Sequence, residues 1–120
     1  MLEYKEVIKA FINEESLTMS LSEVKALDNK LQDNNDFYFE IEGKEYRFIS
    51  DSVIEETFEE YCIDLFDDCY MYQVPEQIKR YIDYGKFVED CRYDGYAHSF
   101  SSYDGYTHIE TDVWNIFRTN

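Results

Sequence analysis

Seven carboxylates crowded into one stretch are the residues whose type and spacing could do chemistry in this chain. They are Glu55, Glu56, Glu59, Glu60, Asp64, Asp67 and Asp68. No Lys or Arg stands between Arg47 and Lys79, although acids four apart on a helix repel each other by roughly 0.2–0.5 kcal/mol per pair. The seven would cover about 20 Å of helix, or about one charge every 3 Å, close to the roughly 3.4 Å per phosphate along one DNA strand. The pattern indicates a helix that imitates a phosphate backbone, with a merely solvated acidic face as the alternative.

The stretch from Asp51 to Tyr70 is expected to hold these acids on one helix. Asp51 and Ser52 can accept the free amide hydrogens of a first turn, and Ser52 with Glu55 has the form of a capping box. The helix should therefore begin near Val53. Its apolar stripe, at steps of three and four, consists of Ile54, Phe58, Tyr61, Cys62, Leu65, Phe66 and Cys69.

Short helices are expected after this long one. Pro75 suits the first position of a helix, where its missing amide hydrogen is harmless, and a further helix should close at Asp94-Gly95. Five acids of this region would support the acidic face of the long helix. They are Glu76, Asp83, Glu89, Asp90 and Asp94.

The amino-terminal part is expected to combine helices with a β-hairpin. Residues 1–35 have the pattern of a helical arm, in which Ser20 and Glu23 form another capping box. Phe37 to Ile41 and Glu45 to Ile49 should form the hairpin. Its inner face would hold either Phe37, Phe39, Ile41, Tyr46 and Phe48 or the alternate set.

The carboxy-terminal part is expected to form an antiparallel three-stranded sheet. Tyr96 to Phe100 and Tyr106 to Glu110 would pair around Asp104-Gly105, and Val113 to Phe117 would add a third strand. The predicted class is α+β. The expected division is residues 1–35 as a helical arm and residues 36–120 as an acidic α+β domain.

The composition predicts a folded, strongly acidic protein. The 120 residues carry a net charge of −16 and are 18% aromatic, whereas disordered acidic tails lack aromatic residues. Such a field repels nucleic acid and anionic membranes and speeds encounter with basic surfaces. The expected partner is thus a basic nucleic-acid-binding protein, with no direct contact to nucleic acid or membrane. Salt adaptation is the alternative explanation of the charge.

The cytoplasm is the expected location. The amino terminus lacks the long apolar run of a signal peptide, and no segment approaches transmembrane length. Cys62, Cys69 and Cys91 are an odd number, and the first two would lie about 10 Å apart by helical rise, beyond disulfide reach. They are expected to be reduced, buried thiols.

Catalysis and metal binding are weaker alternatives. His98 and His108 could bind a metal with nearby carboxylates, but their spacing does not match a zinc signature. Cys91 and His98 could act as nucleophile and base, but Cys91 falls on an apolar helical stripe. We therefore expect no enzymatic activity, no cofactor and no metal. A third alternative is a protein-interaction adaptor, using a tyrosine-rich hairpin that contains Tyr93, Tyr96, Tyr103 and Tyr106.

Residues 45–110, and most strongly 74–96, resemble the carboxy-terminal part of the ArdA antirestriction proteins. The matching residues are Pro75, Glu76, Tyr81, Asp83, Tyr84, Phe87, Asp90, Asp94, Gly95 and Tyr96. The resemblance implies an acidic mimic of bent duplex DNA, carried by phages or mobile elements. Such mimics occupy the DNA groove of type I restriction-modification enzymes in the host bacterial cytoplasm, often as homodimers.

This chain departs from that family in two ways. It is shorter than typical members, and residues 1–35 are expected to be helical where the family usually opens with an α/β domain. These differences bear on whether this chain shares the target enzyme and the homodimeric state of that family. A shortened relative could instead be an anti-CRISPR inhibitor that blocks the basic nucleic-acid channel of a CRISPR effector.

Overall fold

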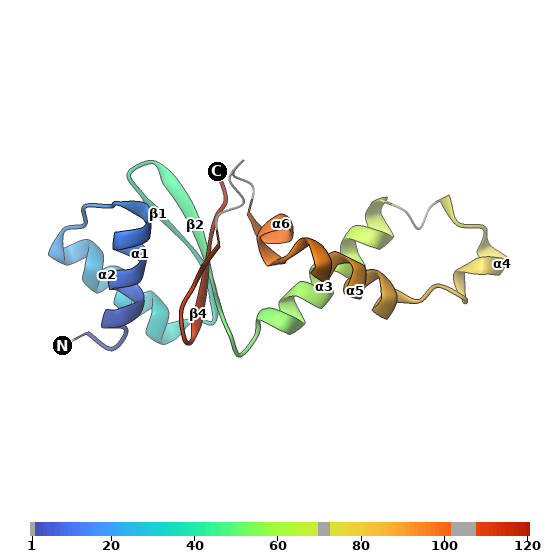
Figure 1. Cartoon of the computed structure of the whole chain (residues 1–120), viewed down its shortest axis with the longest axis horizontal. Helices are drawn as coiled ribbons and strands as arrows, with labels where there is room; N and C mark the ends of the chain where they lie inside the picture. Colours follow the sequence, from blue (N-terminus) through green and yellow to red (C-terminus); the bar gives the residue numbers. More distant parts are fainter. Residues whose placement is uncertain (1, 70–72, 102–107) are drawn as a thin grey trace.

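The computed structural model describes residues 2–69, 73–101 and 108–120, which form an elongated molecule with extents of 58 × 26 × 20 Å (Figure 1). The helices are α1 (Lys5–Glu15), α2 (Leu21–Asp33), α3 (Ile54–Cys69), α4 (Glu76–Lys79), α5 (Tyr84–Asp94) and α6 (Tyr96–Phe100). The strands are β1 (Asp36–Ile41), β2 (Lys44–Ser50), β3 (His108–Glu110) and β4 (Trp114–Arg118). The predicted α+β class is confirmed.

The described strands form an antiparallel sheet with the order β1-β2-β4-β3. Two strands come from the first half of the chain and two from its carboxy-terminal end. β1 and β2 form the predicted hairpin, which turns at Glu42 and Gly43, both with positive φ (54° and 75°). β4 then pairs with β2, with Phe48 opposite Ile116. The prediction of a separate three-stranded carboxy-terminal sheet is wrong in this detail, because the last strands extend the sheet of the first hairpin.

Helices α1 and α2 cover one face of this sheet. Phe11 of α1 is fully buried, and its ring lies edge-on to Tyr46 and Phe48 at centroid distances of 4.8 and 5.1 Å. Leu27 and Leu31 of α2 complete the same core cluster. The strand residues on this face are the first of the two predicted sets, Phe37, Phe39, Ile41, Tyr46 and Phe48. The amino-terminal helices and the sheet therefore share one core.

Local hydrogen bonds fix the start of α2. The Ser20 hydroxyl accepts from the Glu23 amide (3.2 Å), and the Glu23 carboxylate accepts from the Ser20 amide (2.9 Å), as the capping box predicts. The hydrogen bond from the Ser20 backbone lowers the pKa of Glu23.

The buried Asp28 accepts from the Tyr4 amide (2.9 Å) and from Gln32 Nε2 (2.6 Å), which ties the amino-terminal segment to α2.

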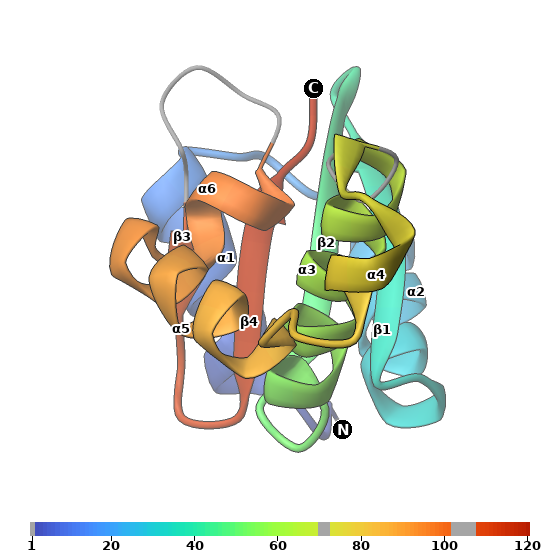
Figure 2. The ribbon, with the colours of Figure 1, turned by 90° about the vertical axis from the view of Figure 1, so that its right-hand side faces the viewer.

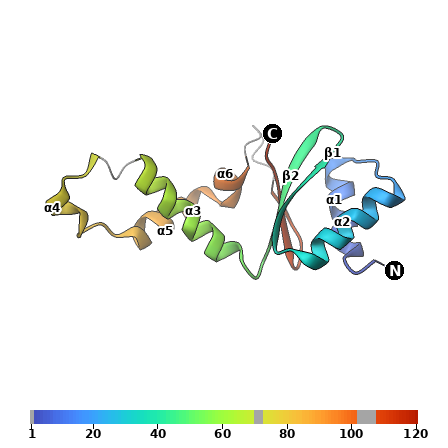
Figure 3. The same ribbon diagram turned by 180° about the vertical axis from the view of Figure 1, so that it is seen from behind.

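The opposite face of the sheet supports α3, α5 and α6. Ile49 and Phe117 of the central strands meet Phe58 of α3 and Val88 of α5 in a second core cluster. α3 then runs away from the sheet, α5 returns beside it, and α4 lies at the far end (Figures 1 and 3). Seen along the long axis, the sheet stands between α1 and α2 behind and these helices in front (Figure 2). We call α3, α4 and α5 together the projection.

Helix α6 replaces a predicted strand. As a helix it lets both Tyr96 and Phe100 contact Phe58, at centroid distances of 5.0 and 6.0 Å. In a strand these two residues would lie roughly 13 Å apart and could not both reach one ring. The predicted turn at Asp104-Gly105 and the first two residues of its partner strand, Tyr106 and Thr107, lie outside the described residues.

We expect Phe11→Ala to lower the free energy of unfolding of the whole chain by about 3–5 kcal/mol, the usual loss for a buried Phe. Chemical denaturation followed by both tryptophan fluorescence and circular dichroism would measure it. Lys9→Ala, an exposed change on the same helix, should alter stability by less than about 0.5 kcal/mol. If Phe11→Ala unfolded only the amino-terminal helices, the shared core would be refuted.

Candidate partner-binding surface

All seven acids predicted for the acidic face are exposed residues of α3, which begins one residue after the expected start. The helix separates them into two rows. The outer row, at steps of four residues, contains Glu56, Glu60, Asp64 and Asp68. The inner row contains Glu55, Glu59 and Asp67.

The inner row faces α5 and is partly neutralised. Arg92 of α5 bonds to Glu55 at 2.6 Å and to Glu59 at 3.3 Å. The hydroxyl of Tyr96 also donates to Glu55, and that of Tyr84 donates to Asp67 at 2.9 Å. Glu55 and Glu59 raise the pKa of Arg92, chiefly through the hydrogen bond to Glu55. The hydrogen bond to Asp67 raises the pKa of Tyr84. The acidic side of α3 is thus not uniformly negative, because Arg92 of α5 contacts the inner row.

The outer row has no cation of the described residues beside it. None of its four carboxylates makes a hydrogen bond or ion pair with another residue in the part of the chain that the structure describes. Glu56 and Asp68 are twelve residues apart, so the row extends about 18 Å along the helix. It offers a basic partner four charges without neighbouring cations, at intervals of about 6 Å.

Contacts between α3 and α5 hold the outer row in place. Phe66 packs on the rings of Tyr84 and Phe87 at centroid distances of 5.6 and 5.0 Å. Together with the bonds of Arg92 nearer the sheet, these contacts run along the full length of an antiparallel helix pair. The side of α3 that packs on α5 is therefore fixed, and the outer row is left facing solvent.

The five supporting acids do not join the outer row. Glu76 pairs with Lys79 within α4 at 2.9 Å, and Asp83 caps α5 by accepting from the Lys86 amide at 3.1 Å. The other three belong to α5 and are not part of α3. They are Glu89 and Asp90, which are exposed, and Asp94, whose side chain lies outside what the structure describes.

The bonds of Arg92 are the feature that the sequence reading missed. Arg92 lies 37 residues from Glu55 in the chain, so no local spacing points to it. The antiparallel return of α5 is the only signal that could have suggested the pairing, because it brings the last turn of α5 to the first turn of α3.

Other candidate sites do not assemble in the described residues. His108 hydrogen-bonds Asn115 (3.0 Å) and stacks on Phe117 at 4.5 Å, and the side chain of His98 is outside the description. No group of three or more His, Cys, Asp or Glu residues comes together there as metal ligands would. Among the same residues, no helix is both long and apolar enough to cross a bilayer.

Of the four tyrosines of the adaptor alternative, Tyr93 is an exposed residue of α5 and Tyr96 lies in α6. Tyr103 and Tyr106 lie outside the residues that the structure describes.

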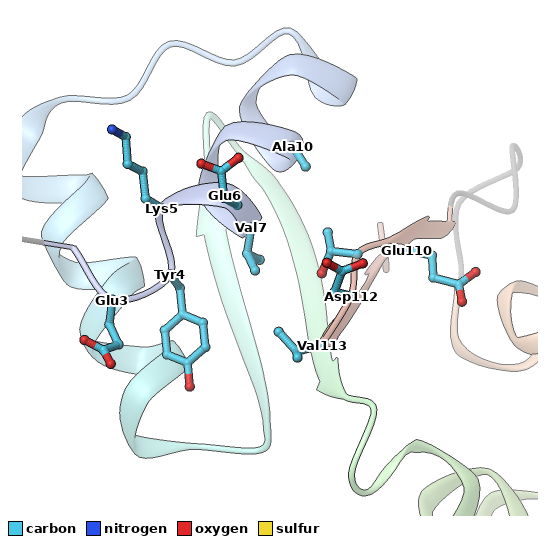
Figure 4. A pocket seen from close by; sticks show the side chains of 10 residues that line it. Glu3, Tyr4, Lys5, Glu6, Val7, Ala10, Glu110, Asp112 and Val113 are labelled. Carbon is cyan, nitrogen blue, oxygen red and sulfur yellow. The ribbon is translucent and has the colours of Figure 1, made fainter.

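A groove of about 560 Å³ lies between the start of α1 and the β3–β4 connection (Figure 4). Its charged lining comprises four carboxylates and one cation, namely Glu3, Glu6, Glu110, Asp112 and Lys5. A phosphate-bearing ligand would be repelled there. The lining of the groove is therefore acidic and does not offer a nucleotide site.

Comparisons of the chain with protein-family models, with curated proteins and with solved structures found no match.

We expect Glu60→Lys to raise the free energy of unfolding by roughly 0.5–1 kcal/mol, because it turns two like-charge pairs four residues apart, with Glu56 and Asp64, into attractive ones. Glu59→Lys is the matched control, since it makes the same charge change on the same helix but places a cation against Arg92. It should lower stability. Thermal denaturation at low and high salt would measure both variants, and equal gains would show that net charge, and not the two-row geometry, governs the stability of α3.

Proposed function

We propose that this protein is a non-catalytic inhibitor that mimics nucleic acid and binds in the basic groove of a host defence enzyme. The observation that carries the proposal is the outer row, Glu56, Glu60, Asp64 and Asp68, exposed and without described partners on a helix that projects from the fold. A basic groove built for phosphates attracts such a row by the same electrostatics.

The spacing of the row supports mimicry. Its carboxylates rise about 6 Å per step, which corresponds to roughly every second phosphate of a DNA strand at about 3.4 Å each. The inner row supplies charge between these steps, reduced by Arg92. The free negative charges along α3 are therefore more widely spaced than seven equivalent carboxylates would be. The principal residues of the mimic are those of the outer row, Glu56, Glu60, Asp64 and Asp68.

The projection supports access to a recessed site. Two packed helices, each roughly 10 Å across, extend from one face of the sheet, while α1 and α2 lie behind the other face (Figure 2). The acidic row can thus enter a groove before the sheet and its amino-terminal helices meet the rim. A compact acidic domain would present only a shallow surface.

The target class follows from the resemblance of residues 74–96 to the ArdA antirestriction proteins. We take a type I restriction-modification enzyme as the target, in the cytoplasm of a bacterial host. The exposed acids of α5, Glu89 and Asp90, would flank the main contact. A CRISPR effector has a basic channel of the same kind, and inhibition of each enzyme in parallel distinguishes the two.

We expect the triple variant Glu56→Lys, Glu60→Lys and Asp64→Lys to weaken inhibition roughly 100-fold or more, because three attractions to a basic groove become repulsions. DNA cleavage by the purified target enzyme, measured against inhibitor concentration at several salt concentrations, would show the loss. For the wild-type protein, inhibition should fall steeply as salt rises.

The control carries the same charge change elsewhere. Glu14→Lys, Asp33→Lys and Glu40→Lys are exposed changes on α1, α2 and β1, and either triple variant moves the net charge from −16 to −10, since each substitution adds two. The control should inhibit nearly as well as the wild type. If both triple variants lost inhibition equally, net charge alone would explain it, and if neither lost any, α3 would not be the contact.

A further inference from the structure

Two thiols meet in the interior of the projection. Cys62 of α3 is fully buried, and Cys91 of α5 is partly buried. Cys62 is a buried member of the core cluster between the helices and the sheet, and Cys91 packs against that cluster. Neither takes part in the acidic surface.

The helix pairing places them opposite each other. Nearer the sheet, Arg92 reaches Glu59 at 3.3 Å, and farther out Phe87 packs on Phe66 at 5.0 Å. In an antiparallel pair, positions advance on one helix as they recede on the other. Cys62 and Cys91 therefore face each other between these two pairings, near the middle of the projection.

We infer that Cys62 and Cys91 form a reversible disulfide that links α3 to α5, with a low-molecular-weight disulfide such as oxidised glutathione as the oxidant. The bond would close the segment from residue 62 to residue 91, which includes α4. That helix buries none of its residues, so the far end of the projection has little packing of its own to hold it. This inference does not depend on the proposed function.

The chemistry is a pair of thiol–disulfide exchanges. Cys91, the more accessible thiol, attacks one sulfur of the oxidant as its thiolate, forming a mixed disulfide and releasing one thiolate. Cys62 then attacks the sulfur of Cys91, forming the internal disulfide and releasing the second thiolate. The two protons lost by the cysteines end on the two released thiols, so two protein thiols are oxidised and one small disulfide is reduced.

Burial sets the order of these steps. Burial raises the pKa of Cys62 to about 12, so this thiol stays protonated near neutral pH and is a poor first attacker. Once Cys91 carries the mixed disulfide, Cys62 is already adjacent to the sulfur it must attack. The same raised pKa slows the second attack, but that attack is intramolecular, and the high effective concentration of Cys62 beside Cys91 offsets it.

The test uses the full chain with Cys69→Ser, which leaves only the proposed pair. Treatment with oxidised glutathione should give a protein lighter by two hydrogens, with a peptide that links Cys62 to Cys91 and no retained glutathione. The melting temperature should rise by roughly 10 °C and return to its starting value with dithiothreitol.

Two further variants test the order of attack. In the same background, Cys62→Ala should stop at a mixed disulfide on Cys91, and Cys91→Ser should leave Cys62 unmodified. Retention of glutathione on Cys91 while Cys62 is present, a disulfide between two copies, or two unreacted thiols would each overturn the inference. If Cys62→Ala failed to fold, Cys91→Ser and the peptide map would still decide, and no readout involves inhibition of an enzyme.

Discussion

The pairing of β2 with β4 is the interaction on which the rest of the structure depends. These strands are neighbours in the sheet although residues 51–113 separate them in the chain. The intervening segment leaves and returns at one point, where the Asp51 amide donates to the Val113 carbonyl (3.0 Å) and Asn115 Nδ2 donates to the Asp51 carboxylate (2.6 Å). Because the two ends of the segment are fixed side by side, its helices can extend outward without opening the sheet.

The same pairing puts β2 and β4 at the centre of the sheet, with both faces covered. Phe48 and Ile116 pack toward α1 and α2, while Ile49 and Phe117 pack toward α3, α5 and α6. The projection is anchored at its base by buried residues such as Phe58, each worth roughly 1.5–3 kcal/mol. Repulsion along the outer row amounts to roughly 0.2–0.5 kcal/mol per pair. Burial therefore outweighs repulsion, and α3 can hold its acidic rows.

Features set by neighbouring residues could be predicted from the sequence, and those set by distant ones could not. The Ser20 capping box forms as predicted. Asp51, a predicted cap of α3, instead accepts from the distant Asn115. One neighbouring contact was also not predicted, because the Ser52 hydroxyl bonds to that of Ser50 (2.9 Å) although Ser52 and Glu55 have the capping-box spacing. The predicted strand at residues 96–100 is wrong because of a distant residue, since the ring of Phe58 contacts both Tyr96 and Phe100 when this segment is a helix. Periodicity located the seven acids, but only the packing of α3 on α5 divides them into two rows.

The division of the acids of α3 into an inner and an outer row indicates what their charge is for. A cation four residues from each acid would stabilise α3 and keep the surface just as polar, so neither folding nor solvation calls for a bare row. The inner row shows that this fold accepts such neutralisation, since Arg92 bridges Glu55 and Glu59. The outer row lies on the same helix and faces solvent without that compensation. Repulsion retained on the accessible side, and relieved on the packed side, is the arrangement expected of a surface whose charges serve a basic partner.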